Sequence, residues 1–217
     1  MSRRLPEERP TEPPTGYKIA HPVLSQDGTR AGFIGVSLGA ALPYGVLDEA
    51  ACVYGRRHRA PHRRCDCGFH CVHARQDAEA LLCTAEHRRA ALLEVTVLGA
   101  YIRFERGFRY ARQRVRTMFS GPCACGAPGA VLADAGWGRP GWCALESVCA
   151  RCAGARRSLA RATFARLAGE GLTVRSVPVA MAAAYDVPEL VAEAALLQAR
   201  LDWFQTQLAR IQRRPRG

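Results

Sequence analysis

The chain carries two close cysteine pairs, Cys123-Ala124-Cys125-Gly126 and Cys149-Ala150-Arg151-Cys152, joined by a segment that contains glycine and tryptophan. A connection of this length lets both pairs converge on one ion, because each pair can occupy two corners of a tetrahedron. Pro122 and Gly126 suit a tight turn around the first pair, since glycine adopts backbone angles that other residues avoid. We therefore predict a four-cysteine zinc site, with the ligands Cys123, Cys125, Cys149 and Cys152.

The residues around this site predict its local structure. Residues 131–144 predict a hairpin that turns near Gly136 to Gly141. The stretch from Cys149 to Ala168 is rich in Ala, Arg and Leu and lacks proline, so it predicts a helix. A knuckle followed by a hairpin and a helix resembles a treble-clef zinc finger. Disulfides or buried free thiols are the alternative, but thiols only one residue apart favour metal.

A second cysteine-rich stretch lies upstream, at Cys65-Asp66-Cys67-Gly68. It repeats the Cys-x-Cys-Gly turn of the first site, and this repetition predicts a second zinc knuckle. Cys52 and His58 precede it and can complete the four ligands, in competition with Cys71, His62, His70 and His73. The alternative for the histidines is a solvated place in a basic loop, together with Arg56, Arg57, Arg59, Arg63 and Arg64.

Three motifs stand in order between Cys52 and Val115. They are His58-x-Ala60-Pro61-x-x-x-Cys65-x-Cys67-Gly68, Val97-Leu98-Gly99 and Glu105-Arg106-Gly107-Phe108-Arg109. This part of the chain resembles an uncharacterised group of cysteine-containing actinobacterial proteins. It departs from that group after Gly68, where Phe69-His70-Cys71 replaces an aliphatic-aromatic-Ala run. The resemblance implies no activity, and it favours Cys52 and His58 as partners of Cys65 and Cys67.

The bulk composition limits the class of protein. The chain has 217 residues, a net charge of +12 and 48% hydrophobic residues, which fits a globular protein that attracts polyanions. Lys18 is the only lysine, and arginine codons are favoured in GC-rich genomes, so the preference for arginine does not itself indicate phosphate binding. The sequence contains no uninterrupted apolar window of about 18 residues, so we expect no membrane span. Its start is charged and proline-rich, so we expect no secretory signal. We therefore expect a cytoplasmic protein without a membrane partner, whose cysteines bind metal or stay reduced.

The middle of the chain predicts a helix and two strands. An apolar stripe predicts a helix over Arg75 to Leu93. Two strand-like runs follow, Glu94 to Phe104 and Phe108 to Met118, and the glycine of Glu105-Arg106-Gly107 suits a hairpin turn between them. Upstream, Ala31 to Leu38 predicts a further strand.

The second strand of this hairpin suggests a nucleic-acid surface. Side chains of a strand alternate between its faces, which predicts one shared face for Phe108, Tyr110, Arg112, Arg114 and Arg116. Arginines in line can follow a phosphate backbone while aromatic rings stack on bases. The alternative is an ordinary solvent-exposed face in an arginine-rich protein.

The end of the chain predicts a short strand and a long helix. Leu172 to Val179 predicts the strand, and Pro188 suits the first turn of the helix. Heptad spacing predicts a seam for a homo-oligomeric or hetero-oligomeric partner through residues 188–213, or for packing on the protein's own body. The seam consists of Leu190, Ala194, Leu197, Leu201, Phe204, Leu208 and Ile211.

Together these patterns predict an α+β fold with a small antiparallel sheet or hairpins, zinc knuckles, a treble-clef-like finger and a long C-terminal helix. The predicted regions are a disordered arm (1–15), an N-terminal α+β region with the first knuckle (16–118), a zinc-finger region (119–177) and the C-terminal helix (178–217).

The function predicted from these features is that of a non-enzymatic accessory or regulatory protein that binds two zinc ions and nucleic acid. The alternative is a zinc-stabilised adaptor that assembles through its C-terminal helix. Four thiolates leave no open position for catalysis, so an enzyme with its site in the histidine-rich stretch 58–73 ranks last.

Overall fold

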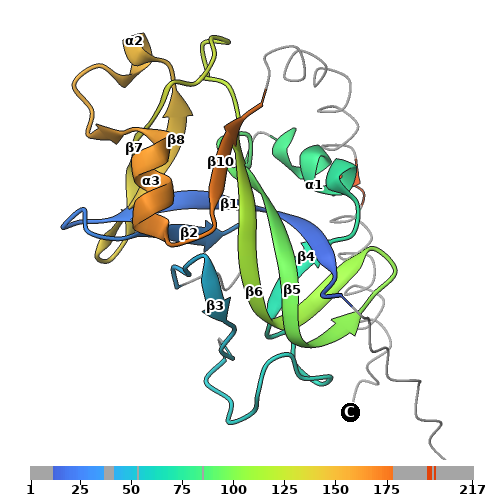
Figure 1. Cartoon of the computed structure of the whole chain (residues 1–217). Helices are drawn as coiled ribbons and strands as arrows, with labels where there is room; N and C mark the ends of the chain where they lie inside the picture. The colour runs from blue at the N-terminus through green and yellow to red at the C-terminus, as the bar shows by residue number, and fades with distance from the viewer. Residues whose placement is uncertain are drawn as a thin grey trace, which may run out of the picture.

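The structure is a computed structural model that describes residues 12–36, 42–52, 54–84, 86–177, 195–196 and 198. Within these residues, ten strands form one sheet with mostly antiparallel pairings, accompanied by three short helices (Figure 1). The predicted α+β fold with a small sheet, a treble-clef-like finger and a long C-terminal helix is therefore wrong. The seam of residues 188–213 falls almost entirely outside the described residues.

Four strands close a circuit of pairings at the centre of the molecule. They are β1 (Thr15–Ser25), β4 (Phe69–Val72), β5 (Ala91–Arg103) and β6 (Gly107–Ser120). Both β4 and β5 pair with β1 on one side and with β6 on the other, always antiparallel. The circuit encloses the largest apolar cluster of the protein, in which side chains such as Phe33, Leu93 and Val95 are fully buried.

The hairpin of β5 and β6 confirms the predicted strand pair. Its turn is closed by the backbone N–H of Phe104, which donates to the carbonyl oxygen of Gly107 at 2.8 Å. The preceding helix is shorter than predicted, because α1 (Arg75–Leu82) ends before β5 begins. Residues 91–93 are buried without alternation, which indicates a strand covered on both faces rather than the stripe of a helix.

The remaining strands extend this circuit. The strand β2 pairs with β1, β3 pairs with β6, and β10 runs parallel to the end of β6. The predicted hairpin after the first cysteine pair is confirmed as β7 and β8, and β8 also pairs with β1. The bounds are β2 (Ala31–Gly35), β3 (Leu47–Glu49), β7 (Val131–Arg139), β8 (Trp142–Val148), β9 (Ser158–Leu159) and β10 (Thr173–Ser176).

The helix predicted from Cys149 to Ala168 is also wrong. The chain forms a single turn, α2 (Ala150–Ala153), then β9, and then a separate helix, α3 (Arg161–Ala168). The break falls at Gly154, whose φ of 52° lies outside the helical range. Phe164 of α3 is fully buried in the central apolar cluster, so this helix packs on the sheet.

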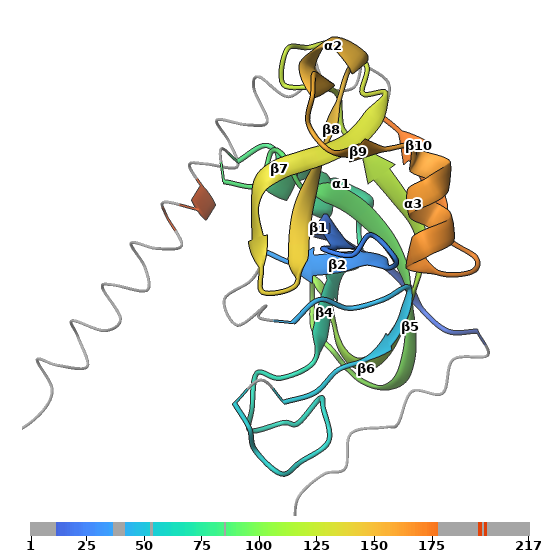
Figure 2. The ribbon, with the colours of Figure 1, turned by 90° about the vertical axis from the view of Figure 1, so that its left-hand side faces the viewer.

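The two cysteine-rich regions lie at opposite ends of the molecule. In both Figure 1 and Figure 2, α2 lies at the top, and the loop between β3 and β4 hangs at the bottom. The predicted division of the chain at residue 118 stays a prediction, although strands from both sides of it share the sheet. Among the described residues, no helix combines the length and the apolar character needed to cross a bilayer.

The single lysine lies inside the central circuit. The Nζ atom of Lys18 is 4.6 Å from the ring centroid of Tyr44 and 5.0 Å from that of Phe69. Its hydrogen bond to the Oε1 atom of Gln113 is long, at 3.5 Å, and Tyr110 also donates to that oxygen. Burial lowers the pKa of Lys18 to about 8, so holding this amine as an ammonium costs free energy.

Candidate metal centres

The structure gathers Cys52, His58, Cys65 and Cys67 into one group, whose ligand atoms lie within 4.8 Å of one another. The sulfurs of Cys52 and Cys65 are 3.8 Å apart, and the sulfur of Cys67 is 3.8 Å from Nδ1 of His58. A tetrahedral zinc ion with bonds of about 2.3 Å to sulfur requires sulfur separations of about 3.8 Å. A disulfide would need about 2.05 Å, so the spacing fits an ion instead.

The histidine of this first centre turns a ring nitrogen toward the thiols. Its Nδ1 atom is 3.8 Å from the sulfur of Cys67 and 3.2 Å from the carbonyl oxygen of Arg59, and its Nε2 atom is buried without a partner in the described part of the chain. A neutral imidazole binds metal through the nitrogen that carries no proton. Nδ1 is therefore the ring nitrogen that the described contacts place beside a thiol of the group.

Arg109 of β6 fastens the first centre to the sheet. This side chain is buried, and its guanidinium donates to the carbonyl oxygens of Cys65 at 2.5 Å and of His62 at 3.3 Å. It also pairs with the exposed carboxylate of Asp66 at 3.3 Å. The knuckle glycine, Gly68, has a φ of 127°, and a Cβ there would lie 3.0 Å from Cγ of Arg109. A methyl group at this position would therefore require Arg109 to shift by a few tenths of an ångström.

The pKa values of two thiols in the first centre, Cys52 and Cys67, are shifted in opposite directions. Burial raises the pKa of Cys67, and its neighbour Cys65 raises it further. Burial also raises the pKa of Cys52, but N–H groups of Arg56 and Tyr54 and nearby thiols outweigh this effect and lower it. The cluster therefore favours one thiolate and resists the next, and a divalent cation would stabilise them together.

The competing ligands of the first centre lie outside the group. Cys71 is buried in β4 as part of the central apolar cluster, where burial raises its pKa to about 11. His62 is exposed and accepts from the backbone N–H of Arg64 through Nδ1. The Nε2 atom of His73 lies 2.9 Å from the carbonyl oxygen of Phe104. His70 is exposed on β4.

The second centre combines Cys123, Cys125, Cys149 and Cys152, whose sulfurs lie within 4.8 Å of one another. The sulfurs of Cys125 and Cys149 are 3.8 Å apart, which is again the edge of a zinc–thiolate tetrahedron. The turn between the first two ligands is closed by the N–H of Gly126, which donates to the carbonyl oxygen of Cys123 at 2.8 Å. The φ of 84° at Gly126 explains the glycine there.

The electrostatics of the second centre also favour a bound cation. Backbone N–H groups of Cys125 and Cys149 lower the pKa of Cys123 to about 6. Hydrogen bonds with the thiols of Cys149, Cys125 and Cys123 raise the pKa of Cys152 to about 12. The protein thus stabilises the first negative charge, while the last thiol keeps its proton unless a cation replaces it.

Arg156 holds the second centre much as Arg109 holds the first. It donates to the carbonyl oxygen of Cys152 at 2.8 Å and to that of Asp134 in β7 at 3.1 Å. Its NH1 atom is also 2.7 Å from Oε1 of Glu146 in β8. The turn of α2 is thereby tied to both strands of the hairpin.

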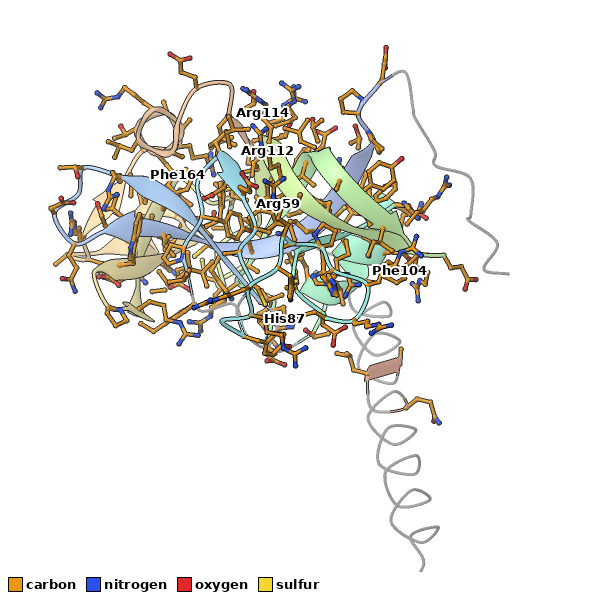
Figure 3. The ribbon with its side chains drawn as sticks, turned by 90° about the horizontal axis from the view of Figure 1, so that it is seen from below. Arg59, His87, Phe104, Arg112, Arg114 and Phe164 are labelled. Carbon is orange, nitrogen blue, oxygen red and sulfur yellow. The ribbon has the colours of Figure 1, made fainter. Side chains whose placement is uncertain are left out.

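The residues predicted for a nucleic-acid face have different surroundings. Tyr110 is fully buried, and its hydroxyl donates to Gln113 at 2.9 Å, so its predicted place on a stacking surface is wrong. The ring instead packs with Phe69 inside the central circuit. Arg112 and Arg116 are exposed and Arg114 is half-buried, and Figure 3 shows Arg112 and Arg114 close together over β6.

The eight residues predicted as ligands are therefore brought together in two groups that could hold metal ions. Sequence reasoning missed Arg109 and Arg156, because the backbone carbonyls that they bind leave no signature in the sequence. No protein-family model, curated protein or solved structure matches the chain.

Proposed function

We propose that this protein binds one zinc ion at each centre and is a non-enzymatic accessory or regulatory protein that binds nucleic acid. The zinc part rests on the sulfur separations of 3.8 Å in both centres and on the Nδ1 atom of His58, which lies 3.8 Å from the sulfur of Cys67. Thiolates and imidazole are the ligands that zinc prefers in structural sites.

Four protein ligands at each centre support a structural role for the ions. A catalytic zinc keeps one coordination position for water and needs a base nearby. Here each group supplies four ligand atoms, and the nearest acid to the first knuckle, Asp66, pairs with Arg109. With four protein ligands on an ion, neither centre would keep the open coordination position that hydrolysis or deamination requires.

The arginines on β6 carry the nucleic-acid part of the proposal. Arg112 and Arg116 are exposed on the same strand, with the half-buried Arg114 between them, in a chain with a net charge of +12. Guanidinium groups bind phosphates with paired hydrogen bonds. Since no exposed ring joins them on β6, we expect contacts with the phosphate backbone rather than with particular bases.

The experiment is a fluorescence-anisotropy titration of the zinc-loaded protein with a labelled 20-nucleotide single strand and with its duplex. Binding should weaken as salt rises, with a slope that falls by about 2 in the double variant Arg112→Gln/Arg116→Gln. Arg139→Gln is the control, because Arg139 is exposed on β7, away from β6. No binding by the wild type at low salt would refute the nucleic-acid role.

A further inference from the structure

We propose that the loop Tyr54–Arg64, which is threaded between the ligands of the first centre, is the main phosphate-binding element, and that it binds only when this centre holds its metal. This inference rests on the proposed function and names the part of the protein that recognises the ligand. The ligand class is the phosphodiester backbone of nucleic acid.

The loop concentrates positive charge without acidic residues. It contains five arginines and no Asp or Glu. All five side chains are exposed, and none of them makes an ion pair within the part of the chain that the structure describes. Guanidinium groups without acidic partners remain available to phosphate. They belong to Arg56, Arg57, Arg59, Arg63 and Arg64.

The loop also offers the exposed aromatic ring that β6 lacks. Tyr54 is 59% exposed, and the guanidinium of Arg56 lies 5.9 Å from the centroid of its ring. An exposed ring beside arginines is the usual combination for single-stranded nucleic acid, because bases stack on the ring while the backbone follows the charges.

The metal ligands divide the loop and fix its parts. Cys52 precedes the arginines, His58 stands among the first three, and Cys65 and Cys67 follow the last two. The loop has no helix or strand of its own in the described residues. Its apolar cluster consists of little more than the ligands, namely Cys52, Cys65 and Cys67 with Ala50 and Ala60. Without an ion, little would hold the arginines in one arrangement.

The loop adjoins the arginines of β6 rather than forming a separate surface. Its entry is tied to β6 by the N–H of Ala50, which donates to the carbonyl oxygen of Ala111 at 2.7 Å. Its exit is held by Arg109, three residues before Arg112. In the view from below in Figure 3, Arg59 of the loop projects onto the same side of the molecule as Arg112 and Arg114. On β6, however, the acid Glu49 lies directly across from Arg112, which weakens the attraction of that strand for phosphate.

The experiment compares three zinc-loaded variants with the wild type in the same anisotropy titrations. The loop variant is Arg57→Gln/Arg59→Gln/Arg63→Gln. These three side chains are exposed and do not belong to the group that could hold the metal ion. We expect at least a tenfold weaker Kd near 0.1 M salt and a salt slope reduced by about 3. The strand variant Arg112→Gln/Arg116→Gln should lose less, and Arg139→Gln should bind as the wild type does.

The metal dependence is tested by substituting His58. His58→Ala should lose the first ion and bind as weakly as the loop variant, whereas His58→Cys should keep both the ion and the binding. Circular dichroism and the metal content of the second centre show whether each variant is folded. If His58→Ala fails to fold, the loop variant alone tests the proposal, since it leaves the ligands in place.

The outcomes separate the two proposals. If the wild type does not bind at low salt, both the function and this inference are wrong. If the wild type binds and the loop variant stays within twofold of it, the function stands and the inference is wrong. A folded His58→Ala protein that lacks the first ion and still binds like the wild type would refute the metal dependence.

Discussion

The first centre lies in a loop whose described residues between 50 and 68 form no helix or strand, whereas the second closes a hairpin that is already part of the sheet. The apolar neighbours differ in the same way. Around the first centre they are chiefly the ligands themselves, while around the second Ala133, Val148 and Ala153 are buried beside them. Similar ligands are therefore set in frameworks of very different strength.

This difference indicates that similar ligands would stabilise the fold at one centre and order a surface loop at the other. At the second centre the chain leaves β6 for β7 and later passes from β8 through α2 toward α3 and β10. A metal ion there would join the two connections that flank the hairpin. At the first centre a metal ion would order a surface loop that carries five exposed arginines. We expect loss of the second ion to weaken the whole fold and loss of the first to affect mainly the surface.

The largest expected effect is a difference in stability between Cys149→Ser and Cys67→Ser. Cys149→Ser should lower the free energy of unfolding by more than about 4 kcal/mol, because the knuckle before β7 and the turn of α2 lose the ion that would join them, whereas Cys67→Ser should cost about 1 to 2 kcal/mol. Urea unfolding followed by circular dichroism in zinc-containing buffer measures both. Equal losses of unfolding free energy in the two variants would contradict the larger contribution that we assign to the second centre.

The sequence alone predicts a wider effect, in which Cys125→Ser or Cys149→Ser unfolds the second half of the chain, because metal binding in such sites is coupled to folding. Because β8 pairs with both β7 and β1, we now expect the hairpin to keep its amide protection in Cys149→Ser, while the turn of α2 loses it. Hydrogen exchange resolved along the chain distinguishes these two outcomes.

The supporting arginines give the next effect. Arg109→Met should destabilise the protein by about 2 to 4 kcal/mol, since the carbonyls of Cys65 and His62 lose a buried, charged donor. Arg156→Met should cost about 1 to 2 kcal/mol, because its side chain is 35% exposed and water can replace it. Urea unfolding of both variants provides the comparison. A larger loss for Arg156→Met would show that the second centre, and not the first, depends more on its supporting arginine.

The two knuckle glycines form a matched pair. Gly68→Ala combines backbone strain at a φ of 127° with a contact of 3.0 Å to Arg109, so we expect a loss of about 2 to 3 kcal/mol. Gly126→Ala has a φ of 84° and meets no atom within 4 Å, so only strain of about 1 kcal/mol is expected. Thermal unfolding measures the difference, and similar values for both would show that Arg109 yields to the methyl group.

The smallest effect concerns Lys18, which contacts neither group of ligands. Its pKa falls from 10.5 to about 8 in the folded protein, so the unfolded chain binds the extra proton between these pH values. The destabilisation is complete below pH 8 and fades as the pH rises toward 10.5. Lys18→Met should therefore stabilise the protein by about 1 to 2 kcal/mol at pH 7, after loss of the cation–π contacts, and by less at pH 10.

Urea unfolding of Lys18→Met and the wild type at pH 7 and pH 10 measures this change, with both centres loaded. The difference between the two proteins removes the contribution of the other titrating groups to first order. A gain that stays constant across these pH values would show that the amine is not held at a cost. A gain that required either ion would show that the core and the centres are not independent.

Local spacing in the sequence was enough to group the ligands, because Cys-x-Cys-Gly turns and nearby cysteines are short-range features. The β5–β6 and β7–β8 hairpins were predictable for the same reason. The closed circuit of strands was not, because it depends on β1 pairing with segments far along the chain. Tyr110 was misplaced because alternation identifies the two faces of a strand, but not which positions of a curved strand remain in the core.

The central claim is that each of the two centres binds one zinc ion. Its most direct test is the zinc content of the purified protein and of two variants, measured by inductively coupled plasma mass spectrometry. The account predicts about two ions per chain in the wild type and about one in each of Cys67→Ser and Cys149→Ser. A wild-type content well below one ion per chain, or either variant with as much zinc as the wild type, would contradict it.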